Sequence, residues 1–233
     1  MNGKLQVPNH IAFILDGNRR WAQKHRLDLF GHKQGEKKFE DVLKWCLKLG
    51  VPHVSAYVLS TENLNRPKKE LDEIFSVAFD FLKRWEKEKT VFDKYEVKVR
   101  FAGDLSKLPP KLVKAMGKIM RRTAKYQKRA LNILVAYGSR FELTNVMRKV
   151  AEKAIKTGHI EISEKDINKN LFVPVPIDLL IRTGGMQRLS NFMLWQASYA
   201  ELIFLDTLWP DFTKKDLIWC IKEYNRRQRK FGK

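Results

Sequence analysis

Arginine recurs in three polar loops of this sequence, and each loop directly follows a short apolar run. The loops contribute Arg19 and Arg20, Arg66, and Arg182 with Arg188. A guanidinium group presents paired N–H donors that match phosphate oxygens two at a time. The third loop, Arg182-Thr-Gly-Gly-Met-Gln-Arg188-Leu-Ser190, adds a hydroxyl and two glycines. Each arginine alone fits a solvated surface charge, but their joint placement favours a site for a phosphorylated ligand.

Two acidic residues stand beside apolar runs in a way that suits metal binding. Asp16 follows the run Ile11–Leu15 and opens Asp-Gly-Asn; Mg²⁺ commonly binds one or two carboxylates together with phosphates. The alternative is a turn in which Asp16 or Asn18 caps a helix. Glu201 begins the run Glu-Leu-Ile-Phe-Leu, where an acid is costly unless it is paired or metal-bound. Its alternative is a salt bridge with a nearby arginine.

The composition favours a soluble protein that meets polyanions. The 233 residues include 46 Lys+Arg against 26 Asp+Glu, a net charge of +20. That excess suits nucleic acid, an anionic membrane or phosphorylated substrates, or it serves solubility alone. No apolar run approaches the roughly 18 residues of a membrane span, and the N-terminus lacks the core of a signal peptide. We therefore expect a cytoplasmic protein, with Cys46 and Cys220 as buried free thiols.

Apolar runs typical of buried strands alternate with helical patterns along the chain. Strands are predicted at 11–15, 54–59, 97–102, 131–137, 177–181 and 202–205. Helices are predicted near 31–50, 71–85, 110–127, 141–157 and 164–170, with a last helix capped by Thr213. The alternation predicts one α/β domain over residues 1–233, with a central, mostly parallel sheet of about six strands flanked by helices. Ligands bind at the carboxyl ends of such strands, so we expect Asp16, the arginines and Glu201 at one edge.

The predicted helix over 71–85 has too many apolar positions for a simple surface helix. One face carries Leu71, Ile74, Phe75, Ala78, Phe79 and Leu82, and Val77, Phe81 and Trp85 lie outside it. A helix that is apolar nearly all round is either deeply buried or faces a cavity as well as the core. Neither a Gly-x-Gly-x-x-Gly motif nor a phosphate-binding loop ending in Gly-Lys-Ser/Thr occurs, so a nucleotide enzyme is not indicated.

Several motifs carry a resemblance to a known family. They are His10–Ala22, Phe30-Gly31-His32-Lys33, Leu59-Ser-Thr-Glu-Asn63 with Arg66-Pro67, Asp178-Leu-Leu-Ile-Arg182-Thr-Gly-Gly, and Asn191-Phe-Met-Leu-Trp-Gln196 through Trp209-Pro-Asp-Phe212. In this order, across nearly the whole chain, they resemble the cis-prenyltransferases, which include the undecaprenyl and dehydrodolichyl diphosphate synthases.

The resemblance implies an Mg²⁺-dependent enzyme that condenses isopentenyl diphosphate onto an allylic diphosphate starter and forms a Z-polyprenyl diphosphate. It implies that Asp16 binds Mg²⁺ and helps the starter's diphosphate leave, and that Glu201 completes the metal site. Ser60 and the catalytic Asn63 match positions implicated in proton removal. The implied diphosphate ligands are Gly17, Asn18, Arg19, Arg20 and His32 for the starter, and Arg182, Arg188 and Ser190 for isopentenyl diphosphate. The other implied substrate-binding residues are Trp21, Thr61, Glu62, Leu64, Arg66 and Leu189.

This chemistry suits the residue types in the motifs. Cleavage of the carbon–oxygen bond leaves charge on the diphosphate, where arginines and Mg²⁺ are stabilising. The reacting carbon must be kept from water, so the resemblance implies an apolar tunnel between sheet and helices. The 71–85 helix would then face both the core and this tunnel. Predicted tunnel residues are Val58, Ile74, Ala78, Phe81 and Leu134.

Some residues depart from the family pattern. Met186 stands where the family usually has Glu, and Arg26 stands in for a further phosphate-binding arginine. In many members a C-terminal arginine reaches across a homodimer; here either Lys230 stands in for it or the register slips by one. The resemblance implies a homodimer with peripheral membrane contact for product release, and no nucleic-acid partner.

Two alternatives remain. One is a non-catalytic family subunit, which the presence of Asp16 with Arg20 and Glu201 argues against. The other is a nucleic-acid-binding protein, for which no basic strand motif with interleaved aromatics is present.

Overall fold

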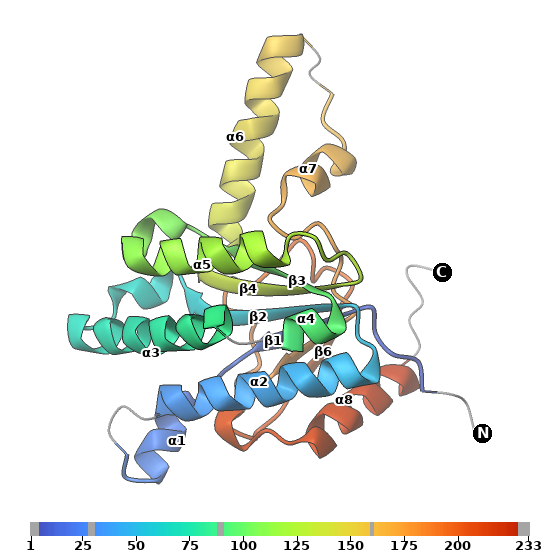
Figure 1. Cartoon of the computed structure of the whole chain (residues 1–233). Helices are drawn as coiled ribbons and strands as arrows, with labels where there is room; N and C mark the ends of the chain where they lie inside the picture. The colour runs from blue at the N-terminus through green and yellow to red at the C-terminus, as the bar shows by residue number, and fades with distance from the viewer. Residues whose placement is uncertain (1–4, 28–30, 88–90, 159–160, 228–233) are drawn as a thin grey trace.

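A sheet of six strands forms the centre of the computed structural model, which describes residues 5–27, 31–87, 91–158 and 161–227 (Figure 1). The strands are β1 (His10–Ile14), β2 (His53–Ser60), β3 (Val97–Ala102), β4 (Arg129–Tyr137), β5 (Leu179–Arg182) and β6 (Glu201–Phe204). Their order across the sheet is β3-β4-β2-β1-β5-β6, and each neighbouring pair is parallel. The predicted α/β fold is therefore confirmed, with a sheet that is entirely parallel.

The helices follow the predicted sequence of elements. They are α1 (Asn18–Lys24), α2 (Gly31–Leu49), α3 (Lys68–Lys87), α4 (Val91–Tyr95), α5 (Pro110–Thr123), α6 (Ser139–Thr157), α7 (Glu164–Asn170) and α8 (Lys214–Arg226). Thr213 caps α8 as predicted, in a reciprocal pair of hydrogen bonds with Asp216. The short helix α4 was not predicted, and α1 was predicted only in the alternative in which Asp16 or Asn18 caps a helix, because each has too few turns to show a helical period. The predicted end of α5 near 127 is also wrong, since the helix ends at Thr123.

The two faces of the sheet are covered in different ways. One face packs against α2, α3, α5 and α8, and it holds the larger core cluster. The other face is covered mainly by segments 171–177 and 189–200. Because β1 is buried on both faces, all five of its residues are buried. In Figure 1, α6 projects away from the sheet with α7 beside it.

Four of the strands bring their following loops to a common edge. β4, β2, β1 and β5 are neighbours, so the loops after Tyr137, Ser60, Ile14 and Arg182 meet there. The chain passes from β1 to one side of the sheet and returns at β5 on the other side, which makes β1 the point where ligands bind in such sheets. The register of β2 against β4 shifts between Tyr57 and Ser60 at this edge, an irregularity of the kind that interrupts the ladder next to functional sites.

Both cysteines are buried free thiols, as predicted. Burial raises the pKa of the Cys46 thiol to about 12. Among the described residues, no helix is both long enough and apolar enough to cross a membrane.

Candidate active site

Asp16 lies two residues past the end of β1, and its backbone is held from two sides. Its carbonyl oxygen accepts hydrogen bonds from the Thr183 hydroxyl at 2.7 Å and the Trp209 N–H at 3.0 Å. Trp209 is buried, and its indole N–H donates to the Gly35 carbonyl of α2 at 2.9 Å. The carboxylate of Asp16 is therefore presented by rigid parts of the fold.

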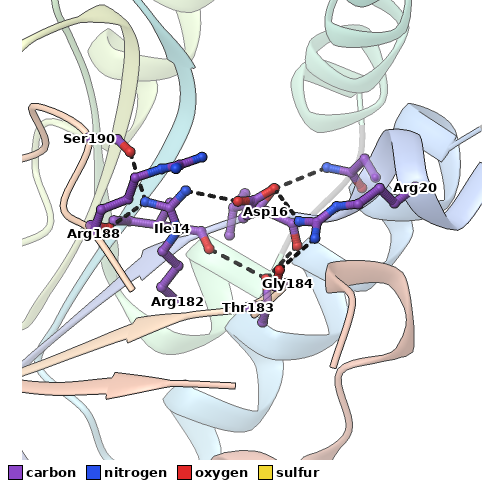
Figure 2. A network of polar contacts seen from close by, with 10 residues as sticks. Ile14, Asp16, Arg20, Arg182, Thr183, Gly184, Arg188 and Ser190 are labelled. Carbon is purple, nitrogen blue, oxygen red and sulfur yellow. Dashed lines mark hydrogen bonds and ion pairs between the residues drawn. The ribbon is translucent and has the colours of Figure 1, made fainter. Parts of the chain in front are cut away.

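The Asp16 carboxylate lies between two arginines, as Figure 2 shows. Its Oδ2 accepts from Arg182 Nη2 at 2.8 Å, and its Oδ1 accepts from Arg20 Nη2 at 3.0 Å. The capping alternative is right that a helix begins here, since α1 starts at Asn18, but neither Asp16 nor Asn18 caps it: the cap is Gly17, and no side chain makes a capping hydrogen bond there. The Asp16 carboxylate therefore does not cap α1 and lies in a cationic cluster.

Arg182 is the last residue of β5 and organises the loop that follows. Its side chain is only 5% exposed, and its Nη1 donates to the Ser190 hydroxyl at 2.8 Å and to the Arg188 carbonyl. Arg20 donates to the Gly184 carbonyl at 2.7 Å. Gly184 has φ +85°, and a Cβ there would lie 2.5 Å from Arg20 Nη2, so only glycine permits this approach.

Three further arginines border the same cavity, Arg19 from α1 and Arg66 and Arg188 from loops. Arg66 is paired with Glu70 of α3 at 3.0 Å, and Arg19 lies 3.8 Å from the same carboxylate. The Arg188 side chain is exposed and also lines the cavity. Together with Arg20 and Arg182, these groups surround Asp16 with an excess of positive charge. Such a site suits a ligand with several phosphate oxygens.

Ser60 and Asn63 form a tight turn on the cavity wall. The Ser60 N–H donates to Asn63 Oδ1 at 3.2 Å, and the Asn63 N–H donates to Ser60 Oγ at 3.1 Å. These reciprocal bonds fix both side chains relative to each other. A hydroxyl and an amide are weak bases, so the pair fits a role in orienting a substrate and relaying its proton.

A cavity of about 660 Å³ joins the charged groups to an apolar interior. Its mouth includes Asp16, Asn18 and the five arginines, and its inner wall includes Phe39, Ile74, Val77, Ala78, Phe81, Leu112 and Met116. α3 thus faces the cavity as well as the core, which confirms the predicted apolar cavity. Val58, Ile74, Ala78 and Phe81 line it as predicted. The prediction for Leu134 is wrong, because that side chain packs into the core on the opposite face of the sheet.

The prediction that Glu201 lies at the same edge as Asp16 is wrong. Glu201 begins β6 and is level with Leu179, which pairs with Ile11. Asp16 lies five residues further along, about 16 Å away at 3.3 Å per strand residue. Glu201 Oε2 instead accepts from Arg227 Nη1 at 3.0 Å, which is the salt-bridge alternative. Among the described residues, no group of three His, Cys, Asp or Glu side chains could hold a metal ion.

Other predicted residues fall around the site rather than in it. Trp21 donates to Asp211 at 2.7 Å, and Arg26 follows α1 with an exposed side chain. Leu64 and Leu189 pack on the two core clusters. Thr61 and Glu62 contact each other beside the cavity. The side chain of His32 and the whole of Lys230 lie outside the described residues.

Some residues that position the site were not predicted from the sequence. Thr183 and Trp209 hold Asp16, and Tyr57 lines the cavity while its hydroxyl donates to the Tyr137 carbonyl at 3.0 Å. Burial raises the pKa of Tyr57, so its phenol keeps the proton that it donates. The spacing of four residues between Arg66 and Glu70 was not a signal for their pairing, because Arg66 has an extended backbone and precedes α3, which begins at Lys68.

Comparisons with known proteins agree over nearly the whole chain. The family model described as "Putative undecaprenyl diphosphate synthase" matches residues 14–232. A tritrans,polycis-undecaprenyl-diphosphate synthase (geranylgeranyl-diphosphate specific) of Methanopyrus kandleri is 43% identical, over 98% of this chain and 86% of that protein. An isoprenyl transferase of Thermotoga maritima is 37% identical, over 98% of each. The crystal structure of lavandulyl diphosphate synthase from Lavandula x intermedia, in complex with dimethylallyl diphosphate, matches with a TM-score of 0.90 at 33% identity, over 97% of this chain and 99% of that chain.

Proposed function

This chain belongs to the undecaprenyl diphosphate synthase family and is a cis-polyprenyl diphosphate synthase, and from that premise we propose how its own residues act. We propose that residues 1–233 form one catalytic domain that binds an allylic diphosphate at Asp16 and isopentenyl diphosphate at Arg182, Arg188 and Ser190. The observation that carries the proposal is the Asp16 carboxylate, held between Arg20 and Arg182 at the mouth of an apolar cavity.

The residues at this mouth fit Mg²⁺ as well as diphosphate. Mg²⁺ is commonly held by one or two carboxylates, with substrate phosphates and water completing its shell. Asp16 supplies such a carboxylate, and Glu201 of the same chain is too far away to join it. When bound, the ion would neutralise charge that develops on the departing diphosphate. Arg19 and Arg20, with Asn18, would hold that diphosphate and stabilise the same charge.

The second substrate would lie on the opposite side of Asp16. Arg188 and the Ser190 hydroxyl would bind its diphosphate, while Arg182 holds the loop. Ser60 and Asn63 would then orient the five-carbon unit and help its proton leave after the new carbon–carbon bond has formed. The apolar wall beyond them would exclude water from the allylic carbon and receive the growing chain.

The direct test is a condensation assay with purified protein, radiolabelled isopentenyl diphosphate and Mg²⁺. A panel of dimethylallyl, geranyl, farnesyl and geranylgeranyl diphosphates would identify the starter. Geranylgeranyl diphosphate is the expected preference, because the first matched relatives carry that specificity in their names. Mass spectrometry would give the product length. Absence of labelled product with all four starters would contradict the proposal.

A substitution in the cavity should shorten the product. Ala78 faces the cavity from α3, so Ala78→Phe places a ring in the space that the growing chain would fill. We expect product shorter by at least one isoprene unit, measured by mass spectrometry. Ser76→Phe is the matched control, because Ser76 is exposed on the same helix and does not line the cavity. Unchanged product length for Ala78→Phe would show that the chain grows elsewhere.

We also propose a cytoplasmic homodimer that touches the membrane at its periphery to release product. The projecting helix α6 supports the dimer, because Met147 is 66% exposed and Ile155 is 83% exposed on it. The net charge of +20 supports attraction to anionic lipid. Light scattering that gives only the 27.4 kDa mass of one chain would contradict the homodimer. Failure of the protein to float with anionic vesicles would contradict the membrane contact.

A further inference from the structure

Asn191 joins the two loops that the proposed function assigns to isopentenyl diphosphate. It follows Ser190 directly, in the loop after β5. Its Nδ2 donates to Glu62 Oε1 at 2.9 Å, and Glu62 lies next to Asn63 in the loop after β2. Among the contacts of the described residues, this hydrogen bond directly links a side chain of one loop to a side chain of the other.

The same asparagine also fixes its own loop to the body of the protein. Its Oδ1 accepts from the Arg140 N–H at 2.9 Å, and its carbonyl oxygen accepts from the Ser139 N–H at 2.7 Å. These N–H groups belong to the first turn of α6, which has no capping side chain of its own. Asn191 therefore satisfies donors at this helix end from a distant loop. Its φ of +62° is one that asparagine tolerates better than most residues.

Close packing leaves little freedom where the three segments meet. A Cβ on Gly138, between β4 and α6, would lie 2.6 Å from Asn191 Nδ2 and 2.7 Å from Thr61 Oγ1. The Thr61 N–H donates to the Tyr137 carbonyl at 2.9 Å, and the Tyr57 hydroxyl reaches the Ser190 carbonyl at 3.3 Å. The loops therefore meet at a rigid point, and the Glu62–Asn191 contact sets their spacing.

Glu62 has the charge that this contact needs. Partial burial alone would raise its pKa, but hydrogen bonds from its own backbone N–H and from Asn191, Ser60 and Thr61 lower it overall. The carboxylate is thus ionised near neutral pH and accepts from both Thr61 Oγ1 and Asn191 Nδ2. It does not line the cavity, so its effect on the substrate would pass through Asn63.

Resting on the proposed function, we propose that the Glu62–Asn191 hydrogen bond is a positioning contact that sets the distance between the diphosphate of isopentenyl diphosphate and the Ser60–Asn63 turn. Isopentenyl diphosphate spans these two loops, with its diphosphate at Arg188 and Ser190 and its reacting carbons at Ser60 and Asn63. A loose spacing would misalign the unit even while both loops remain folded, because a small misplacement of reacting atoms is costly.

Asn191→Asp separates this role from the capping of α6. The aspartate keeps the acceptor for the Arg140 N–H and tolerates the same φ, but it turns a carboxylate toward Glu62. We expect kcat/KM for isopentenyl diphosphate to fall about tenfold, through both kcat and KM, while KM for the allylic starter stays within about twofold. The thermal midpoint should stay close to wild type, because the cap is retained.

A second substitution should restore the contact with donor and acceptor exchanged. In Asn191→Asp combined with Glu62→Gln, the glutamine amide can donate to the aspartate, and we expect most of the lost kcat/KM to return. Asn145→Asp is the matched control, because Asn145 lies on α6, its Oδ1 accepts from Arg148, and the change adds the same charge. Gly138→Ala, which displaces Asn191 Nδ2 and Thr61 Oγ1, should reproduce the loss by an independent route.

The outcomes separate the two proposals. A wild-type protein that makes no product overturns the proposed function, and the positioning role with it. If the wild type is active and Asn191→Asp has the same kcat/KM for isopentenyl diphosphate as Asn145→Asp, the positioning role alone is overturned. An Asn191→Asp defect that Glu62→Gln does not reduce, or that raises KM for both substrates equally, also overturns it, since a general loss of structure would act in that way.

Discussion

Asp16→Ala is expected to lower kcat by about a thousandfold or more while the protein stays folded. The magnitude is that of removing a group that stabilises charge in the transition state. The carboxylate is the proposed Mg²⁺ ligand at the cavity mouth, and it also balances the charge of Arg20 and Arg182. Incorporation of radiolabelled isopentenyl diphosphate measures the loss, and circular dichroism checks the fold.

Asp16→Ala should not weaken the binding of a phosphate anion, although it lowers kcat. Without Asp16, the two guanidinium groups lose their partner and become available to an anion. We therefore expect inorganic pyrophosphate, without Mg²⁺, to bind Asp16→Ala at least as tightly as wild type in calorimetry. Asp80→Ala is the control, because Asp80 is exposed on α3 and outside the cavity lining. Undiminished turnover in Asp16→Ala would remove Asp16 from the mechanism.

The fold was predictable because its signals are local and repeated. Each buried strand is a short apolar run, and each long helix shows an apolar face. The helix boundaries at Gly50 and Thr213 follow from residue types that end or cap helices, and Ser163 caps α7 in the same way. α4 escaped prediction, and α1 was predicted only in the capping alternative, because a helix of one or two turns leaves no period and its stability comes from tertiary packing.

Glu201 shows how a correct strand can still give a wrong site. The strand that begins there was predicted, and in a parallel sheet its first residue lies at the edge opposite the residue that follows another strand. The sequence therefore held enough information to separate Glu201 from Asp16. That prediction relied on the residue type, an acid beside an apolar run, and not on the position of Glu201 at the start of its strand. In the structure, Arg227 forms a salt bridge with Glu201 and neutralises its charge.

The contacts that hold the site were not predictable, because they join residues far apart in the chain. Trp209 binds the Asp16 carbonyl, and Asn191 bonds to Glu62 across more than a hundred residues. Nothing in the spacing of either pair marks it as a contact. Sequence reasoning found the charged groups that could touch a substrate, whereas the groups that orient them required the register of the strands and the loop conformations.

Acid is expected to destabilise the protein by about 3 kcal/mol between pH 7.5 and pH 4 through His10 alone. His10 is fully buried at the start of β1. Burial, with a smaller contribution from His53, lowers its pKa from 6.5 to about 4. In the unfolded chain the ring takes up a proton below about pH 6.5, whereas the folded protein takes it up only near pH 4. The stabilisation of the folded state by neutral, buried His10 is therefore intact above pH 6.5 and is lost as the pH falls toward 4.

The hydrogen bonds of His10 explain why its ring stays neutral. Nδ1 lies 3.1 Å from the carbonyl oxygens of Val175 and Pro176, which only accept, so Nδ1 carries the proton. Nε2 lies 2.7 Å from Ser55 Oγ and accepts from that hydroxyl, while Asn132 Nδ2 donates to the same oxygen at 3.0 Å. A second proton on Nε2 would force the Ser55 hydroxyl to find another acceptor in a buried, apolar setting.

Urea unfolding at pH 7.5 and at pH 4 measures the effect when wild type is compared with His10→Gln. The glutamine variant should be less stable at pH 7.5, but its stability should fall by about 3 kcal/mol less on acidification. His25→Gln, which removes an exposed histidine from the end of α1, should follow the wild-type pH dependence. If His10→Gln proves too unstable to measure, a pH titration of the His10 ring resonances in the wild type gives the pKa of the folded state directly. A midpoint for the His10 ring near pH 6.5, or equal pH dependence for wild type and His10→Gln, would show that burial of this histidine does not make folding sensitive to acid.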